Sequence, residues 1–139
     1  MHVILQEKEK YILRFDLEEE VVGGLIEFAQ VEKIDAAHFT AIGASGEILL
    51  SSYNLESKQY EDRSIQEDLE ITGMVGNIAL MENKLIIHAH GTFSRKDFSV
   101  IGGHVKKLIV SATCEVHLTR LSGKMERVYN EQTGLNLLT

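Results

Sequence analysis

The sequence predicts an α+β fold in which helices flank a largely antiparallel β-sheet. Most apolar segments alternate or are rich in β-branched residues, as strands are, and only one segment has helical periodicity. The expected strands follow one another in runs rather than alternating with helices, which favours α+β over a doubly wound fold. The 139 residues contain no internal repeat or linker, so we expect one domain covering residues 1–139.

Residues 11–15 (YILRF) predict a first strand, and a helix is expected directly after it. Asp16 stands three residues before Glu19, which is the spacing of a capping box at a helix start. Apolar residues then recur on one helical face: Val21, Val22, Leu25, Ile26 and Ala29. Gly23 and Gly24 each weaken a helix by about 1 kcal/mol relative to Ala. We therefore expect them to pack closely against a neighbouring element.

Three β-rich runs follow the helix, at residues 38–42, at residues 47–53 and around Gln59 and Tyr60. The first two are separated by residues 43–46 (GASG). This link predicts a tight turn or a β-bulge, because glycine adopts backbone conformations that other residues avoid.

The second half of the chain predicts a hairpin and two further strands. Residues 68–81 alternate in the strand pattern, residues 81–84 have turn chemistry, and residues 85–90 run back. A long strand at residues 108–121 and a short one at residues 125–129 complete the expected sheet.

The charge and the cysteine content restrict the function classes. With 14 basic and 21 acidic residues the net charge is −7, which argues against strong nonspecific binding to DNA. The single Cys114 excludes an internal disulfide and fits a reducing compartment; on the apolar face of its strand it is expected to be an inert core thiol. The chain has no signal-peptide pattern and no long uncharged apolar run, so we expect a cytoplasmic protein without a membrane partner.

Three histidines are the most unusual feature of the sequence. His88 and His90 alternate along one expected strand, so they share a face with Cα atoms about 7 Å apart. That spacing suits two imidazoles that converge on one ion. His104 follows Gly102 and Gly103, whose backbone freedom permits a turn back toward the strand pair.

Three histidines suit a divalent metal. Neutral imidazole is a common ligand of zinc and also suits copper, nickel and iron. Three protein ligands with an open fourth position are typical of catalytic rather than structural zinc. The alternative is that His88 and His90 are polar residues on a solvent-facing strand, and that His104 belongs to a loop or a helix start.

Other charged residues are candidates for roles near this site. Glu70, on the adjacent expected strand, is a candidate base or ligand-orienting carboxylate, with a solvated or interface glutamate as the alternative. Four basic residues around the expected site either attract an anionic ligand or are solvated loop charges: Arg95, Lys96, Lys106 and Lys107.

The remaining histidines carry less information. His117 shares a strand face with Thr113 and Glu115 and is expected at the surface or in a subunit contact, with a place beside the metal as the alternative. His2 and His38 give no functional signal.

Short motifs along nearly the whole chain carry a family resemblance: residues 43–44 (GA), Tyr53, residues 58–61 (KQYE), 69–71 (LEI), 76–78 (GNI), 88–90 (HAH), 102–104 (GGH), 111–113 (SAT), 115–116 (EV) and 133–135 (TGL). Together they resemble the prokaryotic, stand-alone branch of the PPC domain. This "plants and prokaryotes conserved" domain occurs beside AT-hooks in plant nuclear proteins.

The resemblance implies an antiparallel sheet flanked by helices and assembled as a homotrimer. It also implies that some prokaryotic members hold a metal, typically zinc, on the histidines that match His88, His90 and His104. The family is similar in fold to a domain of acetolactate decarboxylase, whose zinc is held by an HxH pair and a later histidine. Similarity of fold does not by itself carry function.

Three functions from different classes follow. The first is a metal-binding homotrimer whose three-histidine site takes a small anionic or carbonyl ligand, and we rank it first. The second is a metal-dependent lyase or hydrolase, so whether the protein is an enzyme stays open. The third, suggested by the plant relatives, is a DNA-associated regulator. The chain contains no proline and so lacks the Arg-Gly-Arg-Pro segment of an AT-hook, and its charge makes DNA an unfavourable partner.

Overall fold

The computed structural model describes residues 1–139 as one helix and nine strands. The elements are β1 (His2–Glu7), β2 (Lys10–Asp16), α1 (Val21–Val31), β3 (Ala37–Asn54), β4 (Gln59–Ile65), β5 (Leu69–Met81), β6 (Lys84–Ser94), β7 (Val100–Arg120), β8 (Arg127–Asn130) and β9 (Leu135–Leu138). The largely antiparallel sheet is therefore confirmed. The fold is mainly β, because a single short helix covers the sheet where flanking helices were expected.

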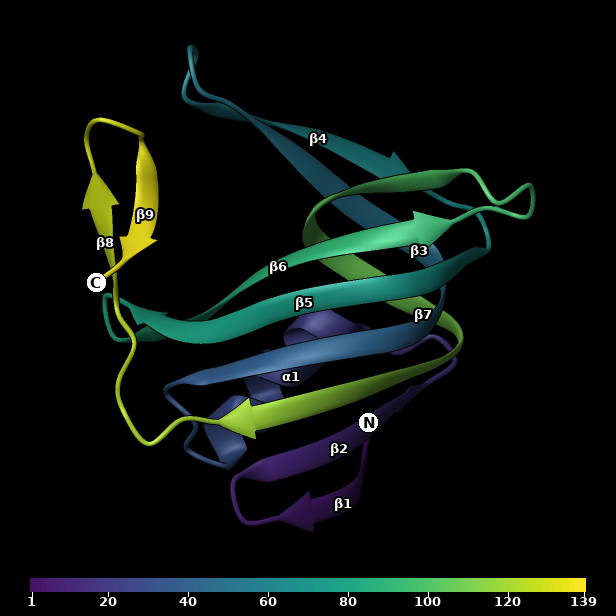
Figure 1. The fold of residues 1–139 in the computed structure, drawn as a ribbon, viewed down its shortest axis with the longest axis horizontal. Coiled ribbons are helices and arrows are strands. Elements are labelled where there is room, and N and C mark those ends of the chain that lie inside the picture. Colours follow the sequence, from purple (N-terminus) through teal and green to yellow (C-terminus); the bar gives the residue numbers. More distant parts are fainter.

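The main sheet has seven strands in the order β1-β2-β7-β6-β5-β3-β4, and β7 also pairs with β3. Every pairing in it is antiparallel. Since β3 pairs with both β5 and β7, and β6 also pairs with both, these four strands close a ring. The long strand β7 curves from β6 at its start to β2 at its end (Figure 1).

Residues 43–46 form bulges within the single strand β3, not a turn between two strands. The register of β3 against β7 shifts between Gly43 and Ser45 and again between Ser45 and Glu47. Gly43 has φ +146°, and a Cβ atom there would lie 2.1 Å from the carbonyl oxygen of Thr113. Only glycine fits this close approach, and the bulges bend β3 without ending it.

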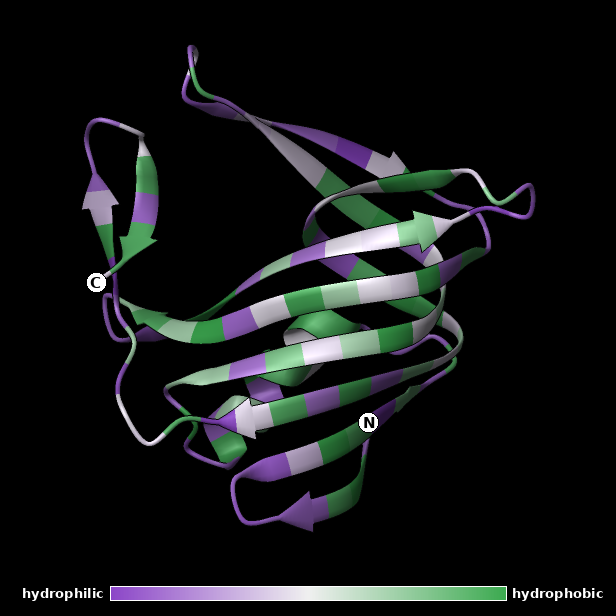
Figure 2. Ribbon diagram, in the orientation of Figure 1, coloured by the Kyte–Doolittle hydropathy of each residue, from purple (hydrophilic) through white to green (hydrophobic).

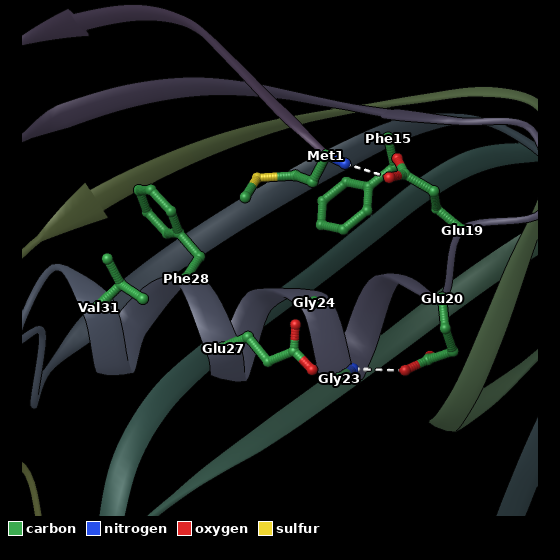
Figure 3. Close-up of a pocket in the computed structure, with 9 residues that line it drawn as sticks. All are labelled: Met1, Phe15, Glu19, Glu20, Gly23, Gly24, Glu27, Phe28 and Val31. Atoms are coloured by element: carbon green, nitrogen blue, oxygen red, sulfur yellow. Dashed lines mark hydrogen bonds and ion pairs between the residues drawn. The ribbon is translucent and has the colours of Figure 1, made fainter.

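Helix α1 begins at Val21, with Glu20 as its N-cap. The Glu20 carboxylate accepts a hydrogen bond from the amide of Val22 at 2.9 Å. It also accepts one from the amide of Gly23 (Figure 3). The expected pair at residues 16 and 19 does interact, because the Asp16 amide donates to the Glu19 carboxylate at 2.7 Å. That contact belongs to the turn after β2, and the expected helix start at Asp16 is wrong, because the observed cap, Glu20, lies four residues later.

The core lies between α1 and the inner face of the sheet. The helix buries its apolar face there, and the strands show alternating hydrophobic and hydrophilic bands (Figure 2). A Cβ atom on Gly24 would lie 2.6 Å from the Phe15 ring, which confirms the expected close packing for Gly24. A Cβ atom on Gly23 would meet only the Glu20 side chain, which belongs to the cap of the same helix. Cys114 is fully buried, and burial raises the pKa of its thiol to about 12, so it is an inert core residue.

Strands β1 and β9 fall outside the sequence prediction. β1 pairs with β2 at the sheet edge and is exposed throughout, and β9 pairs with β8 in a separate two-stranded hairpin. This hairpin stands beside the end of β5 (Figure 1). The fold contains no helix with the length and apolarity that crossing a membrane requires.

Candidate metal centre

Strands β6 and β7 bring the three histidines together. His88 and His90 lie on the outer face of β6, and Ala89 between them is buried in the core. β7 begins at Val100, and His90 and His104 are Cα partners in the β6–β7 ladder. His104 therefore belongs to a strand, and its alternative placement in a loop or at a helix start is wrong.

The imidazole rings converge on one point. The candidate ligand nitrogens of His88, His90 and His104 all lie within 4.8 Å of one another. Their ring centroids are 5.1 to 5.5 Å apart. Two nitrogens bound to one tetrahedral zinc lie about 3.3 Å apart at ordinary Zn–N lengths, so small side-chain rotations would complete the fit. The donor set, three imidazoles without a carboxylate or thiolate, suits zinc and similar borderline metals.

The protein environment keeps two of these rings neutral. Desolvation lowers the pKa of His104 from 6.5 to about 4, with smaller contributions from His88 and His90. Desolvation also lowers the pKa of His88, and the nearby Arg127 guanidinium adds to this effect. Both imidazoles are therefore unprotonated at neutral pH, which is the form that binds metal.

Arg127 of β8 lies beside His88. Its Nη2 donates to Oδ1 of Asn77 at 2.9 Å and lies 3.2 Å from Nδ1 of His88. Because a guanidinium has no acceptor, Nδ1 of His88 accepts in this contact. An ion bound through Nδ1 would displace Nη2, and an ion bound through Nε2 would put a proton on Nδ1. If the three histidines held a metal, Arg127 would therefore no longer donate to His88.

Tyr60 and Lys106 lie on the other side, around His104. The Tyr60 ring is 5.6 Å from the His104 ring between centroids, and Lys106 Nζ lies 5.0 Å from the Tyr60 centroid. Lys106 also donates to the Asp62 carboxylate at 2.7 Å, and Asp62 accepts from the Ser51 hydroxyl at 2.6 Å. Hydrogen bonding to Lys106 lowers the pKa of Asp62. These contacts hold the wall beside His104 in place.

A cavity of about 280 Å³ opens next to the histidines. Tyr60, His88, His104 and Arg127 line its polar part, together with Asn136 of β9. Its apolar lining comes from Met81, Ile86, Ile87, Leu135 and Leu137. A small ligand in this cavity would contact two of the three imidazoles.

Three of the four basic residues considered as anion attractors are paired with carboxylates. Arg95 pairs with Glu67 at 3.0 Å, Lys106 with Asp62 and Lys107 with Glu47, both at 2.7 Å. The fourth, Lys96, lines a different cavity. None of them supplies an unpaired cation at the histidines.

Glu70 lies away from the cluster within the chain. It pairs with Ser94 on β6, four residues beyond His90, which is about 13 Å along the strand. It lines a separate cavity of about 680 Å³ with Arg95 and Lys96. Its carboxylate is therefore too far away to act on an ion held by the histidines of the same chain.

The other histidines lie apart from the site. His117 is exposed on β7, opposite Thr40 of β3. His2 is exposed and lies 2.9 Å from Asp16. His38 is exposed on β3 opposite Asn77, and strand β5 separates it from His88.

Sequence reasoning missed Arg127, Tyr60 and Asn77 as residues around the site. Tyr60 and Asn77 stand in motifs that carry the family resemblance, so that signal was available for them. Arg127 is one charged residue on a four-residue strand, and nothing in the local pattern distinguishes it. Only the packing of β8 against β5 places it beside His88.

Together these features define a class: a small, mainly antiparallel β-domain with three histidines of two neighbouring strands converging beside a cavity. The model of the Plants and Prokaryotes Conserved (PCC) domain, the PPC domain named above, matches residues 4–122. The chain belongs to this family. A comparison with curated proteins gives no match.

Solved structures of two proteins are similar to this chain over nearly its whole length. A Bacteroides thetaiotaomicron protein, whose name gives DNA binding as a provisional function, is 31% identical with a TM-score of 0.93, over 97% of this chain and 94% of that one. A metal-containing protein from Archaeoglobus fulgidus is 33% identical with a TM-score of 0.89, over 100% of this chain and 99% of that one.

Acetolactate decarboxylase from Bacillus subtilis is similar at the level of the fold alone. It is 13% identical with a TM-score of 0.55, over 84% of this chain and 54% of the enzyme. The likeness to one part of that enzyme is confirmed, and it carries no activity to this chain.

Proposed function

We propose that this protein holds one divalent metal ion, zinc by preference, on His88, His90 and His104 and presents it to a small anionic or carbonyl ligand. The convergence of the three candidate nitrogens within 4.8 Å is the observation that carries the proposal. The lowered pKa values of His88 and His104 support it, because neutral rings are ready to bind. The metal-containing relative at 33% identity supports it independently.

The open coordination position is the functional part of this proposal. Three protein ligands leave a tetrahedral ion one position for water or a ligand. The neighbouring cavity, which His88 and His104 line, gives a small molecule access to that position. The ion would polarise a carbonyl oxygen or a bound water there.

We further propose that the protein works as a homotrimer, as the family resemblance implies. The outer sheet face exposes large apolar side chains, with Ile42 56% and Val75 59% exposed. Val75 is the cross-strand neighbour of His90, the most exposed ligand candidate. A subunit packed on this face would cover it beside the metal site. Light scattering that gives the mass of three chains would support the trimer.

A metal-dependent lyase or hydrolase is the second candidate function. The cavity beside an ion with an open position favours it, since this is the arrangement of catalytic zinc. It also needs a group that moves a proton, and Glu70 does not supply one within the chain.

DNA binding is the function suggested by the name of the Bacteroides relative. We propose that it does not extend to this chain. The net charge of −7 opposes contact with phosphates, and several cations in the sheet are already paired with carboxylates. Binding to duplex DNA that persists at 200 mM salt would contradict this proposal.

Elemental analysis of protein purified without an affinity tag or added metal tests the main proposal. We expect about one zinc per chain in the wild type, and none in His88→Ala or His90→Ala. His117→Ala, which removes an exposed histidine outside the cluster, is the matched control and should keep its metal. A metal-free wild-type protein that also fails to bind added zinc would refute the metal site.

A further inference from the structure

We propose that Arg127 is the anion-recognising residue of the histidine cavity, and that the cavity binds the carboxylate of a small aliphatic carboxylic acid. The inference deepens the proposed function and rests on it, because the same cavity opens on His88 and His104. It narrows the ligand from small anions and carbonyl compounds in general to one chemical class, and it assigns recognition to a named side chain.

The charge of Arg127 is not compensated within the chain. Of the five arginines, three pair with carboxylates: Arg14, Arg95 and Arg120. Arg63 is exposed to solvent. Arg127 alone is half-buried without a carboxylate within 4 Å, although the chain carries 21 acidic residues. A partly desolvated, unpaired cation is unfavourable, so an anion brought to it gains binding energy.

The acceptors that Arg127 does have are neutral. Nη1 donates to the backbone carbonyl of Asn136 at 2.9 Å, and Nη2 is shared between Asn77 and His88. Nε is shielded from solvent and finds no acceptor in the chain. Shielded donors without a partner are rare in folded proteins, which points to an acceptor supplied from outside.

Metal uptake would prepare the guanidinium for a carboxylate. Once His88 binds an ion, Nη2 loses His88 as an acceptor, as described above. Nε and Nη2 lie along one edge of the planar guanidinium, and two parallel N–H groups on one edge match the two oxygens of a carboxylate. Turning this edge toward the cavity would engage both donors with one ligand.

The cavity walls select a carboxylate with a short aliphatic chain. One guanidinium matches the single negative charge of a carboxylate, whereas phosphate carries more charge and requires additional hydrogen-bond donors. The apolar side chains of Ile86, Leu135 and Leu137 suit a hydrocarbon tail. A volume of about 280 Å³ limits this tail to a few carbons.

Butanoate is the probe that tests the inference, with butanamide as its uncharged analogue of the same shape. Titration calorimetry measures affinity, and the ¹⁵N resonance of Arg127 Nε reports contact with the side chain. We expect butanoate to bind the zinc-loaded wild-type protein and to shift this resonance, while butanamide and inorganic phosphate do neither.

Arg127→Gln removes the charge, and Arg63→Gln removes an equal charge from the exposed arginine as the matched control. We expect Arg127→Gln to weaken butanoate binding by about tenfold or more, because charge-assisted bidentate hydrogen bonds are the strong ones. Arg63→Gln should leave the affinity unchanged. Zinc content, measured on both variants, should stay at the wild-type level.

Two outcomes would overturn the inference: equal affinity of the wild type for butanoate and butanamide, or equal affinity of Arg127→Gln and wild type for butanoate. The first needs no variant, so it holds even if Arg127→Gln folds poorly. If the wild type holds zinc but ignores butanoate, the carboxylate subsite fails and the metal site stands. If it holds no zinc yet binds butanoate through Arg127, the metal proposal fails instead.

Discussion

Two cavities beside the sheet are each lined by an arginine, and they differ in whether a carboxylate pairs with that arginine. The larger one, about 680 Å³, is lined by Glu70, Arg95 and Lys96 among others. Its arginine is held by Glu67 at 3.0 Å. The smaller one, about 280 Å³, is lined by His88, His104 and Arg127. Here the arginine meets only neutral acceptors.

The difference teaches that the larger volume does not make a cavity the better candidate for a binding site. The arginine of the larger cavity is neutralised by Glu67, and an anion that approached it would have to compete with this ion pair. The smaller cavity combines converging neutral imidazoles with an unpaired cation. Partly buried polar groups without a partner indicate a binding site, because leaving them unpaired is unfavourable in free energy until a ligand binds to them.

The largest expected effect separates the two cavities by their metal affinity. His104→Gln should lower zinc affinity by more than a hundredfold, since loss of a ligand exceeds the ten- to hundredfold cost of losing a supporting contact. Glu70→Gln should leave zinc affinity unchanged, because Glu70 pairs with Ser94, which lies about 13 Å along β6 from His90. Competition titration with a zinc-binding dye measures both. A large loss in Glu70→Gln would place that carboxylate at the ion.

The second effect concerns the dependence of stability on pH in metal-free protein. The folded state holds the pKa of His104 at about 4, below the ordinary value of 6.5. Between these values the unfolded chain binds more protons than the folded chain, so the free energy of unfolding should fall as pH drops from about 6.5 to about 4. Urea titrations across this range should show the fall.

A pair of variants assigns that pH dependence to the histidine end of the sheet. His104→Gln should flatten the curve, while Thr72→Ser, a change without a titratable group at the larger cavity, should keep the wild-type slope. Equal slopes in wild type and His104→Gln would show that His104 does not carry the effect.

The smallest expected effect comes from a variant that makes the larger cavity resemble the smaller one in having an arginine without a carboxylate partner. Glu67→Gln removes the carboxylate that neutralises Arg95, so the larger cavity should gain weak affinity for butanoate. We expect a gain of only a few-fold, because the Arg95 side chain is 33% exposed and water screens its charge. The ¹⁵N resonance of Arg95 Nε measures it. No gain at all would mean that an unpaired cation alone does not create an anion site here.

The sequence predicted what depends on local order. Alternation along β6 put His88 and His90 on one face, and this followed directly from the two-residue period of a strand. The strands of the β5–β6 hairpin were also predictable, because their alternation and turn residues are contiguous. Residues 43–46 were harder, since a turn and a bulge share the same glycine signal, and only the contact of Gly43 with Thr113 decides between them.

What depends on long-range register was not predictable from local patterns. His104 reaches His90 because β7 starts at Val100 and pairs with β6, eight residues earlier than the expected strand. Arg127 reaches His88 because β8 packs on β5, and no periodic pattern of residues in the sequence predicts that contact. The glycine pair before His104 and the family resemblance together indicated the third histidine, and nothing in the sequence indicated the arginine.

Anomalous X-ray diffraction at the zinc absorption edge, on crystals of the zinc-loaded protein, tests the central claim most directly. The account predicts one strong peak per chain, within bonding distance of one nitrogen from each of His88, His90 and His104. A peak bound elsewhere, or no peak at these residues in a crystal grown with excess zinc, would contradict it.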